Sequence, residues 1–317
     1  MGVAFLAGVL YFCSMKSLIA ILALAFANPV AEVEDNSIPT DTLHIESIEV
    51  TASLKSDDAL RTPIASTELA MSRIERMGVS SIKDVSLIAP NFYQPNYGSS
   101  ITSSIYVRGF GSRIDQPVLG VTIDDIPLMN KNAYDFDFYD IRKLELLRGP
   151  QGTLYGRNTS GGVMNITTLS PLSWQGLRAM AEYSTMTSYR ASVAYYTKPR
   201  DNFGISAAAH FSHDGGYFRN TYTDQMCDRG NNASARLRMQ WLLRDNWSLD
   251  NSLTWGYTKE GGYAYHHLNP TTNTTEDVAY NDPSGYERIA ITEGFVAKYQ
   301  GEKILLSSAT SYQYLND

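Results

Sequence analysis

Cysteine, positive charge and long apolar runs are all scarce in this sequence. Its 317 residues include 2 cysteines, Cys13 and Cys227, and 33 acidic against 26 basic side chains, for a formal net charge of −7. The acidic balance argues against a nucleic-acid-binding surface, which needs a basic face. Beyond the N-terminus no run of about 18 apolar residues occurs, which argues against a helical membrane span. Membrane strands leave no such run, so the composition permits a membrane β-barrel without demonstrating one.

Motifs of the common hydrolases and nucleotide-binding proteins are also missing. The sequence has no Gly-x-Ser-x-Gly elbow, no His-Glu-x-x-His zinc motif and no Gly-x-x-x-x-Gly-Lys-Ser/Thr phosphate loop, since Gly156 is followed by Arg157 and Asn158. His266 and His267 are adjacent but have no Cys or carboxylate partners at metal-ligand spacing. The sequence therefore predicts a protein that is not an enzyme and that has no metal site or cofactor of its own.

The N-terminus is typical of an export signal. Met15 and Lys16 precede a short apolar segment, residues 17–26, and the stretch Ala25 to Ala27 supplies the small side chains that signal peptidase favours. We expect residues 1–27 to be a signal peptide, with Met15 as the alternative true start. An uncleaved N-terminal anchor is the competing interpretation. Cleavage would leave Cys227 as the single cysteine, which excludes an intrachain disulfide.

Two stretches of different character follow the signal. Residues 28–52 begin with an acidic, proline-containing stretch, Asn28–Ser47, which is typical of a mobile tether, and end with the short segment 48–52. Residues 53–171 contain two expected helices, Thr67–Met77 and Ser81–Ile88, each opening on a residue that can cap free backbone N–H groups. Short strands between Gly-, Asn- and Asp-rich turns are expected at Ser104–Arg108, Val118–Ile123, Ile141–Leu147 and Val163–Thr168. The pattern predicts a small α+β domain.

From residue 172 the pattern changes to an alternation of apolar and polar residues. Seven runs show it: Gly176–Thr185, Tyr189–Thr197, Phe203–His213, Ala233–Leu243, Trp247–Tyr257, Arg288–Tyr299 and Lys303–Tyr312. Each run has about the length of a tilted strand that crosses a bilayer. Short connections largely alternate with long ones, as expected when the two rims of a barrel face different compartments. We expect antiparallel transmembrane β-barrel strands over residues 172–317, with a soluble β-sandwich as the alternative.

Seven strands are too few for a complete barrel around such a domain. A barrel wide enough for a domain of about 120 residues has roughly 22 strands. Because the sequence stops at Asp317 just after a strand, we expect a fragment or a truncated reading frame with an incomplete barrel. An open sheet edge in lipid would leave unpaired backbone groups, each costing several kcal/mol.

Four stretches, in order, resemble the plug domain of TonB-dependent outer-membrane receptors. They are Ile48–Ala52 (IEVTA), which resembles the TonB box, Ile105–Phe110 (IYVRGF), Val121–Pro127 (VTIDDIP), and Leu147–Gly156 (LRGPQGTLYG) continued through Thr167. The resemblance is closest to siderophore-type receptors and covers roughly Ile48 to the chain end. It implies an α+β plug domain followed by barrel strands, in the outer membrane of a Gram-negative bacterium.

This resemblance implies active uptake of a scarce ligand, with a ferric siderophore as the first expectation and cobalamin, haem or a glycan as alternatives. The implied partners are TonB, with ExbB and ExbD, and outer-membrane lipid; no nucleic acid is expected. The coupling residues would be Ile48, Glu49, Val50, Thr51 and Ala52, whose alternation suits strand addition to the edge of a partner's sheet. Two alternatives belong to other functional classes. One is a non-transporting binding or adhesion module, and the other is a secreted hydrolase.

The resemblance also implies roles for residues inside the plug. Arg108 and Arg148 would lie between plug and barrel and pair with barrel glutamates that come after Asp317. The remaining motif residues are Gly109, Gly149, Pro150, Gly152 and Gly156. The glycines at positions 149, 152, 156, 161 and 162 permit positive φ and close backbone approach in a compact turn. Aromatic side chains of two plug loops are the expected ligand contacts: Tyr93, Tyr97, Tyr134 and Phe136. Packing of these rings against the barrel wall is the alternative.

Overall fold

The computed structural model describes residues 49–50, 57–58, 64–95, 104–112, 117–134, 136–243, 246–262, 264–282, 284–301 and 303–317. The expected signal peptide (1–27) and the tether up to residue 48 lie outside these ranges. Among the described residues, no helix is long and apolar enough to cross a membrane.

A five-stranded mixed sheet is the centre of the α+β domain, residues 64–171. Its order is β3-β9-β10-β7-β8. The strands are β3 (Ala65–Ala70), β9 (Ile141–Arg148), β10 (Gly162–Thr168), β7 (Leu119–Ile123) and β8 (Ile126–Pro127). β9 pairs antiparallel with both β3 and β10, whereas β10 pairs parallel with β7. All four strands predicted in this domain are therefore confirmed, since β5 (Ile105–Val107) supplies the remaining one.

The core of this domain lies where the sheet meets its short helices. Leu69, Leu119, Leu144 and Met164 are fully buried sheet residues. They share a cluster with side chains of α2 (Met71–Arg76), α3 (Ile82–Val85) and the 3-10 helix η1 (Lys131–Tyr134). A small second sheet consists of β4 (Phe92–Tyr93), β5 and β6 (Phe110–Ser112), and α4 (Gly152–Tyr155) lies between β9 and β10.

Both helix predictions need correction. The helix expected at Thr67–Met77 was wrong in its first half, because residues 65–70 form β3 and pair with β9 over six positions. Tertiary pairing outweighs the local helix propensity of this segment. The helix expected at Ser81–Ile88 is a single turn, α3, followed by further turns. Its start was correct: the Asp84 carboxylate accepts hydrogen bonds from the backbone N–H of Ser80 at 2.8 Å and of Ser81 at 2.9 Å.

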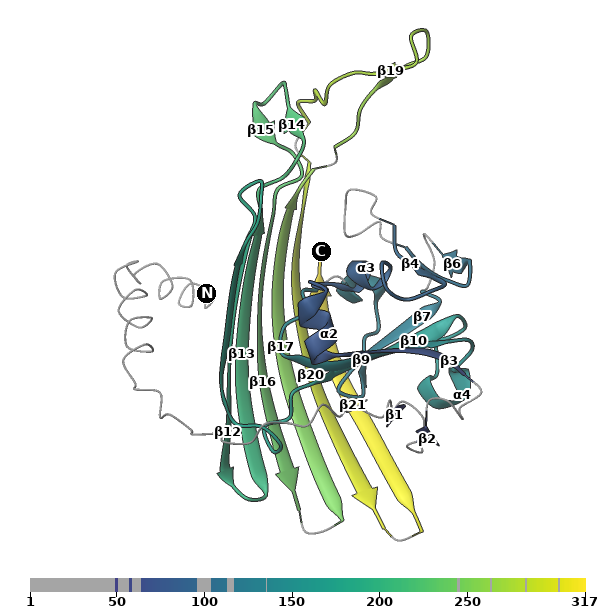
Figure 1. The fold of residues 1–317 in the computed structure, drawn as a ribbon, viewed down its shortest axis with the longest axis vertical. Helices are drawn as coiled ribbons and strands as arrows, with labels where there is room; N and C mark the ends of the chain where they lie inside the picture. The colour runs from purple at the N-terminus through teal and green to yellow at the C-terminus, as the bar shows by residue number, and fades with distance from the viewer. Residues whose placement is uncertain are drawn as a thin grey trace, which may run out of the picture. The chain divides into compact units, whose positions relative to one another are not determined.

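Seven long strands form the rest of the fold (Figure 1). They are β11 (Gly176–Tyr183), β12 (Tyr189–Arg200), β13 (Phe203–Asp214), β16 (Gly230–Leu242), β17 (Trp247–Gly261), β20 (Gly285–Gln300) and β21 (Leu305–Asn316). Each pairs antiparallel with the next in the chain. All seven predicted strands are confirmed. The long connections contain the hairpins β14 (Arg219–Asn220) to β15 (Gln225–Met226) and β18 (Leu268–Asn269) to β19 (Thr274–Thr275).

The two faces of the seven-stranded sheet differ in polarity. One face contacts the α+β domain and carries arginine, histidine, serine and threonine side chains. The other exposes large apolar side chains, each between 38% and 58% accessible: Leu177, Val193, Tyr195, Phe211, Leu237, Leu253, Trp255 and Phe295. Because successive strand residues point to opposite faces, the alternation in the sequence produces this difference directly. An apolar outer face suits lipid contact.

Candidate functional site

Buried ion pairs join the α+β domain to strand β16. Asp140 accepts a hydrogen bond from Arg236 Nη1 at 2.6 Å, and the two side chains are only 4% and 5% exposed. Two residues along the same face of β16, Arg238 Nη1 lies 3.0 Å from Asp124, and its Nη2 lies 2.5 Å from Asp250 on β17. Desolvated charges are tolerated only when they are paired and hydrogen-bonded. These contacts therefore specify where the domain docks on the sheet.

The turn between β7 and β8 prepares Asp124 for this role. Asp124 has a φ of 49°, in the left-handed region, so its carboxylate turns back toward the end of β10. There it accepts hydrogen bonds from the backbone N–H of Thr168 at 3.0 Å and from the Thr168 hydroxyl at 2.7 Å. The same hydroxyl accepts from Arg238 Nη1 at 2.7 Å. Contacts within its own domain therefore orient the Asp124 carboxylate toward Arg238.

A second polar cluster joins the domain to β13. The Asp137 carboxylate lies 3.0 Å from His210 Nε2 and accepts a hydrogen bond from the Ser212 hydroxyl at 2.6 Å. The His210 ring stacks on Tyr139, with centroids 5.3 Å apart and planes at 5°. The Arg236 guanidinium lies 5.2 Å from the centre of the Tyr139 ring, which adds a cation–π contact. Three residues of the segment 137–140 therefore contact the long strands. Asp137 contacts β13, Tyr139 contacts both β13 and β16, and Asp140 contacts β16.

The pKa of Asp137 predicts that this contact weakens in acid. Burial raises the pKa, but hydrogen bonds from His210 and Ser212 outweigh it and hold the pKa below its ordinary value. Such a carboxyl stabilises the folded state above its unfolded pKa of about 3.9 and stops doing so as the pH falls through the lower folded value. We expect Asp137→Asn to increase the amide hydrogen-exchange rate of residues 136–140 at neutral pH. The difference in rate between the variant and the native protein should disappear in acid. A difference in rate that does not change with pH would contradict this.

The β7–β8 turn contacts the last two strands of the sheet. Lys298 Nζ lies 2.5 Å from Asp125, with both side chains 46% exposed. Gln313 donates a hydrogen bond to the Pro127 carbonyl at 2.6 Å. Ile126 packs directly on Gly294, where a Cβ would come within 2.5 Å of the isoleucine Cγ1. Gly294 therefore leaves the space that the turn occupies.

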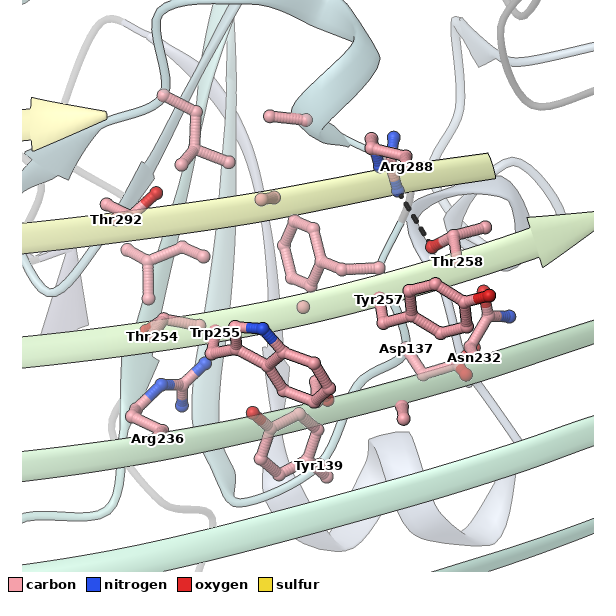
Figure 2. Close-up of a pocket in the computed structure, with 18 of the residues that line it drawn as sticks. Asp137, Tyr139, Asn232, Arg236, Thr254, Trp255, Tyr257, Thr258, Arg288 and Thr292 are labelled. Carbon is pink, nitrogen blue, oxygen red and sulfur yellow. Dashed lines mark hydrogen bonds between the residues drawn. The ribbon is translucent and has the colours of Figure 1, made fainter. Parts of the chain in front are cut away.

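The described residues enclose a small and a large cavity between the domain and the sheet. The small cavity, of about 100 Å³, separates apolar side chains of the domain from serine, threonine, alanine and glycine positions of β16, β17 and β20. Figure 2 shows Arg288 and Thr258, hydrogen-bonded at 3.2 Å, on one side of it and Arg236 and Tyr139 on another. The large cavity, of about 340 Å³, lies between α2 and strands β11 to β13.

Comparison with known proteins identifies the α+β domain. Residues 58–163 match the family model of the TonB-dependent Receptor Plug Domain. Residues 58–163 of this chain are therefore similar to the plug domain of TonB-dependent receptors. The match begins before β3 and ends at the second residue of β10, so it includes β3, β7, β8 and β9 of the five-stranded sheet in full and only the start of β10.

Relatives of known sequence and structure extend the match beyond the plug. The pesticin receptor of Yersinia enterocolitica is 31% identical over 174 residues, which are 54% of this chain and 24% of that receptor. The vitamin B12 transporter BtuB of Vibrio vulnificus is 28% identical over 51% of this chain and 26% of its own length. The ferric yersiniabactin uptake receptor FyuA of Yersinia pestis has a TM-score of 0.70 and 21% identity, over 80% of this chain and 41% of that structure. The covered 80% of this chain is longer than the plug domain, so the shared fold includes barrel strands as well.

The two motif arginines lie close together on the plug. Arg148 Nη1 donates a hydrogen bond to the Pro90 carbonyl at 2.6 Å, and Nη2 donates to the Ser66 carbonyl at 2.9 Å. Burial and then the neighbouring Arg108 lower the pKa of Arg148. Arg108 itself is exposed, with a φ of 54°. Within the described residues these partners of Arg148 belong to the plug, and the pairing of both arginines with barrel glutamates stays a prediction.

The motif glycines are not equivalent. Gly109, Gly149 and Gly156 have φ values of 78°, 130° and 72°, as a left-handed turn requires. Gly152 has neither a positive φ nor a close neighbour, since a Cβ there would lie 3.9 Å from Thr159 Oγ1. Pro150 follows β9 and leads into α4. Three of these four glycines therefore occupy positive-φ positions, which disfavour any side chain.

The predicted ligand contacts fall in different environments. Tyr93 is 60% exposed, with its ring centre 6.5 Å from that of Tyr106. Phe136 is half-buried and lines the small cavity. Tyr134 is 2% exposed, and its hydroxyl donates a hydrogen bond to the Leu119 carbonyl at 3.1 Å. Tyr134 therefore packs in the plug core, and its burial raises its pKa to about 12. A role in ligand contact stays a prediction. Tyr97 lies outside the described residues.

The predicted coupling segment is described in part. The backbone of Glu49 and Val50 forms β1 (Glu49–Val50), which pairs antiparallel with β2 (Asp57–Asp58). Ile48, Thr51 and Ala52 lie outside the described residues. A strand at this position agrees with the alternation in the sequence, and its role in coupling stays a prediction.

Proposed function

We propose that this protein is an outer-membrane receptor that takes up a scarce ligand when TonB pulls on residues 48–52. The observation that carries the proposal is the plug docked on the polar face of the barrel strands by the Asp140–Arg236 and Asp124–Arg238 ion pairs. A domain held in this way closes the path along the strands. It must be displaced, at the expense of external work, before a ligand can pass.

The coupling segment would supply the grip for that work. An extended segment can add to the edge of a partner's sheet, where main-chain hydrogen bonds hold it regardless of side-chain identity. TonB, together with ExbB and ExbD, is the proposed partner. The segment precedes β3 in the chain, so a pull on it reaches the edge strand of the plug sheet first.

A ferric siderophore is the ligand class that we propose. Structural relatives include FyuA, a ferric yersiniabactin uptake receptor, and PiuA of Acinetobacter baumannii, a siderophore receptor with a TM-score of 0.66 and 13% identity over 84% of this chain. Tyr93 offers an exposed aromatic face that suits catecholate or phenolate groups. Cobalamin is the second candidate, because a vitamin B12 transporter is among the sequence relatives.

Uptake by a Val50→Pro variant tests the proposal. Proline removes a backbone donor from the segment and disfavours strand pairing. We expect iron-starved cells that produce the full-length protein to accumulate one of four labelled probes, each of them named for a similar receptor or transporter: ferric yersiniabactin, ferripyoverdine, ferric enterobactin or cobalamin. Val50→Pro should reduce accumulation to background while surface binding of the probe persists.

Val50→Ala is the matched control, because it keeps the backbone donor and should keep uptake. Equal accumulation in the native and Val50→Pro proteins would contradict coupling through this segment. Binding without accumulation in every variant would favour the non-transporting binding module.

A further inference from the structure

A carboxyl group interrupts the apolar outer face of the seven-stranded sheet. Glu293 lies on β20 directly opposite Leu253 of β17, whose exposed side chain belongs to that face. The residues on either side of it, Thr292 and Gly294, line the small cavity beside the plug. Because successive strand residues point to opposite faces, Glu293 points away from the plug. Its side chain is exposed and makes no hydrogen bond or ion pair within the described residues.

The strand register places Glu293 well inside the lipid-facing band. Trp247 and Tyr299 are cross-strand partners at one end of β17 and β20, with ring centres 5.0 Å apart, and such aromatic rings are typical of a membrane interface. Glu293 comes six residues before Tyr299 on the same strand. At about 3.3 Å per residue and a tilt of about 40°, it lies roughly 15 Å from this interface, in an apolar band about 25 Å tall. Glu293 is therefore distant from both interfaces.

A glutamate at this depth needs a hydrogen-bonding partner. Whether it is ionised or protonated, a carboxyl group has hydrogen-bonding sites that hydrocarbon cannot satisfy. Ionisable residues inside a membrane are therefore rare and usually pair with another polar group. Both strands that flank β20, namely β17 and β21, belong to the described sheet, and neither supplies a hydrogen bond to Glu293. The partner must therefore come from beyond this sheet.

Hydroxyl groups lie beside Glu293 on the same face. Tyr312 of β21 is directly opposite Glu293, and Thr310 is diagonally across from it. Both side chains are exposed, and neither makes a hydrogen bond in the described part of the chain. The outer face of β12, β13 and β16 exposes large apolar side chains instead, among them Val193, Phe211 and Leu237. Glu293, Thr310 and Tyr312 therefore form a polar patch, the β20–β21 patch, that contains an acceptor together with donors.

We propose that the β20–β21 patch joins two copies of this protein in the membrane, with Glu293 of each copy accepting a hydrogen bond from the Tyr312 hydroxyl of the other. A two-fold axis along the membrane normal keeps each residue at its own depth and makes the patch meet itself. Glu293 and Tyr312 are cross-strand partners and lie at nearly the same depth, so the symmetry brings each carboxyl group to a phenol. The exposed side chains of Leu253 and Phe295 pack around these two hydrogen bonds. This inference depends on the membrane position of the strands and not on uptake.

Photo-cross-linking from position 310 tests this contact. The full-length protein carries benzoylphenylalanine in place of Thr310 and is illuminated in outer-membrane vesicles. We expect a product of twice the monomer mass that contains this protein alone. Glu293→Leu should lower the yield of this product at least about tenfold, because it removes both hydrogen bonds to a carboxyl group. Tyr312→Phe removes only the donor hydroxyl and should lower the yield by a similar factor, whereas Glu293→Gln keeps an acceptor and should retain most of it.

Matched controls make the result specific. Tyr314→Phe removes a hydroxyl two residues along the same face of β21 and should not change the yield. Benzoylphenylalanine in place of Val193, on the outer face of β12, should give no product of twice the monomer mass. Leucine suits a lipid-facing position, so Glu293→Leu should fold, which the heat-dependent electrophoretic mobility of the barrel verifies. Equal yields from positions 193 and 310, or a yield that Glu293→Leu and Tyr312→Phe leave unchanged, would overturn the proposal. Adducts from position 310 with lipid only, or with a different protein, would also overturn it.

Discussion

Asp140→Ala is expected to release the plug from strand β16 at a cost of about 3–5 kcal/mol, the range for removing one partner of a buried ion pair. The variant leaves the Arg236 guanidinium buried without its carboxylate, since both side chains are at most 5% exposed. The cation–π contact with Tyr139 cannot replace a full negative charge. Hydrogen exchange of the full-length protein in detergent should show lost protection in residues 136–142, while the outer strands β20 and β21 keep theirs.

Two further variants make this result specific. Asp140→Leu combined with Arg236→Met should recover most of the loss, because an apolar pair of similar volume avoids the desolvation cost. Lys298→Met, which removes an ion pair with 46% of each side chain exposed, should cost at most about 1 kcal/mol. Equal effects of Asp140→Ala and Lys298→Met would show that the buried pair does not hold the plug.

Gly162→Ala is expected to prevent the plug sheet from forming. Gly162 pairs with Arg148 at the start of β10, and a Cβ there would overlap with the carbonyl oxygen of Leu147 on β9. Backbone atoms on both strands would have to separate, so we expect destabilisation of about 3 kcal/mol or more, at the upper end of overpacking costs. Limited proteolysis should cut the variant within residues 64–168 under conditions where the native plug resists.

Gly152→Ala is the matched control within the same motif. Its added methyl group would meet nothing closer than 3.9 Å, and it replaces glycine in α4 by a better helix former. We expect resistance to proteolysis equal to or above that of the native protein. If the two variants were equally stable, the close approach of β9 and β10 at Gly162 would not be required.

The sequence predicted the strands well because their cause is local. Alternation such as Leu237, Met239 and Trp241 against Arg236 and Arg238 follows from the two faces of a strand, and the structure keeps that register. The helix expected at Thr67–Met77 failed for the opposite reason. Whether Ala65 to Ala70 forms a strand depends on β9, about 75 residues later in the chain, so no local rule could settle it.

The docking contacts could not be predicted, although one signal was present. Arg236 and Arg238 are charged residues on the inner face of a membrane strand, which requires partners, but spacing alone does not reveal which carboxylates supply them. Asp124 and Asp140 become partners only through the left-handed turns at φ 49° and 53° that direct them to β16. Tyr134 illustrates the converse, since its place in an aromatic loop gave no sign of its burial in the core.

Photo-cross-linking from Phe136 tests the central claim, that this plug docks on the polar face of the barrel strands. Phe136 lines the small cavity, which gives room for a benzoylphenylalanine side chain in its place. After illumination of the full-length protein in outer-membrane vesicles, mass spectrometry should find adducts on inner-face residues of β16, β17 and β20, such as Ser234, Thr254 and Thr292. Adducts confined to residues 64–168, or on the lipid-facing side chains of β17, would contradict the docked arrangement.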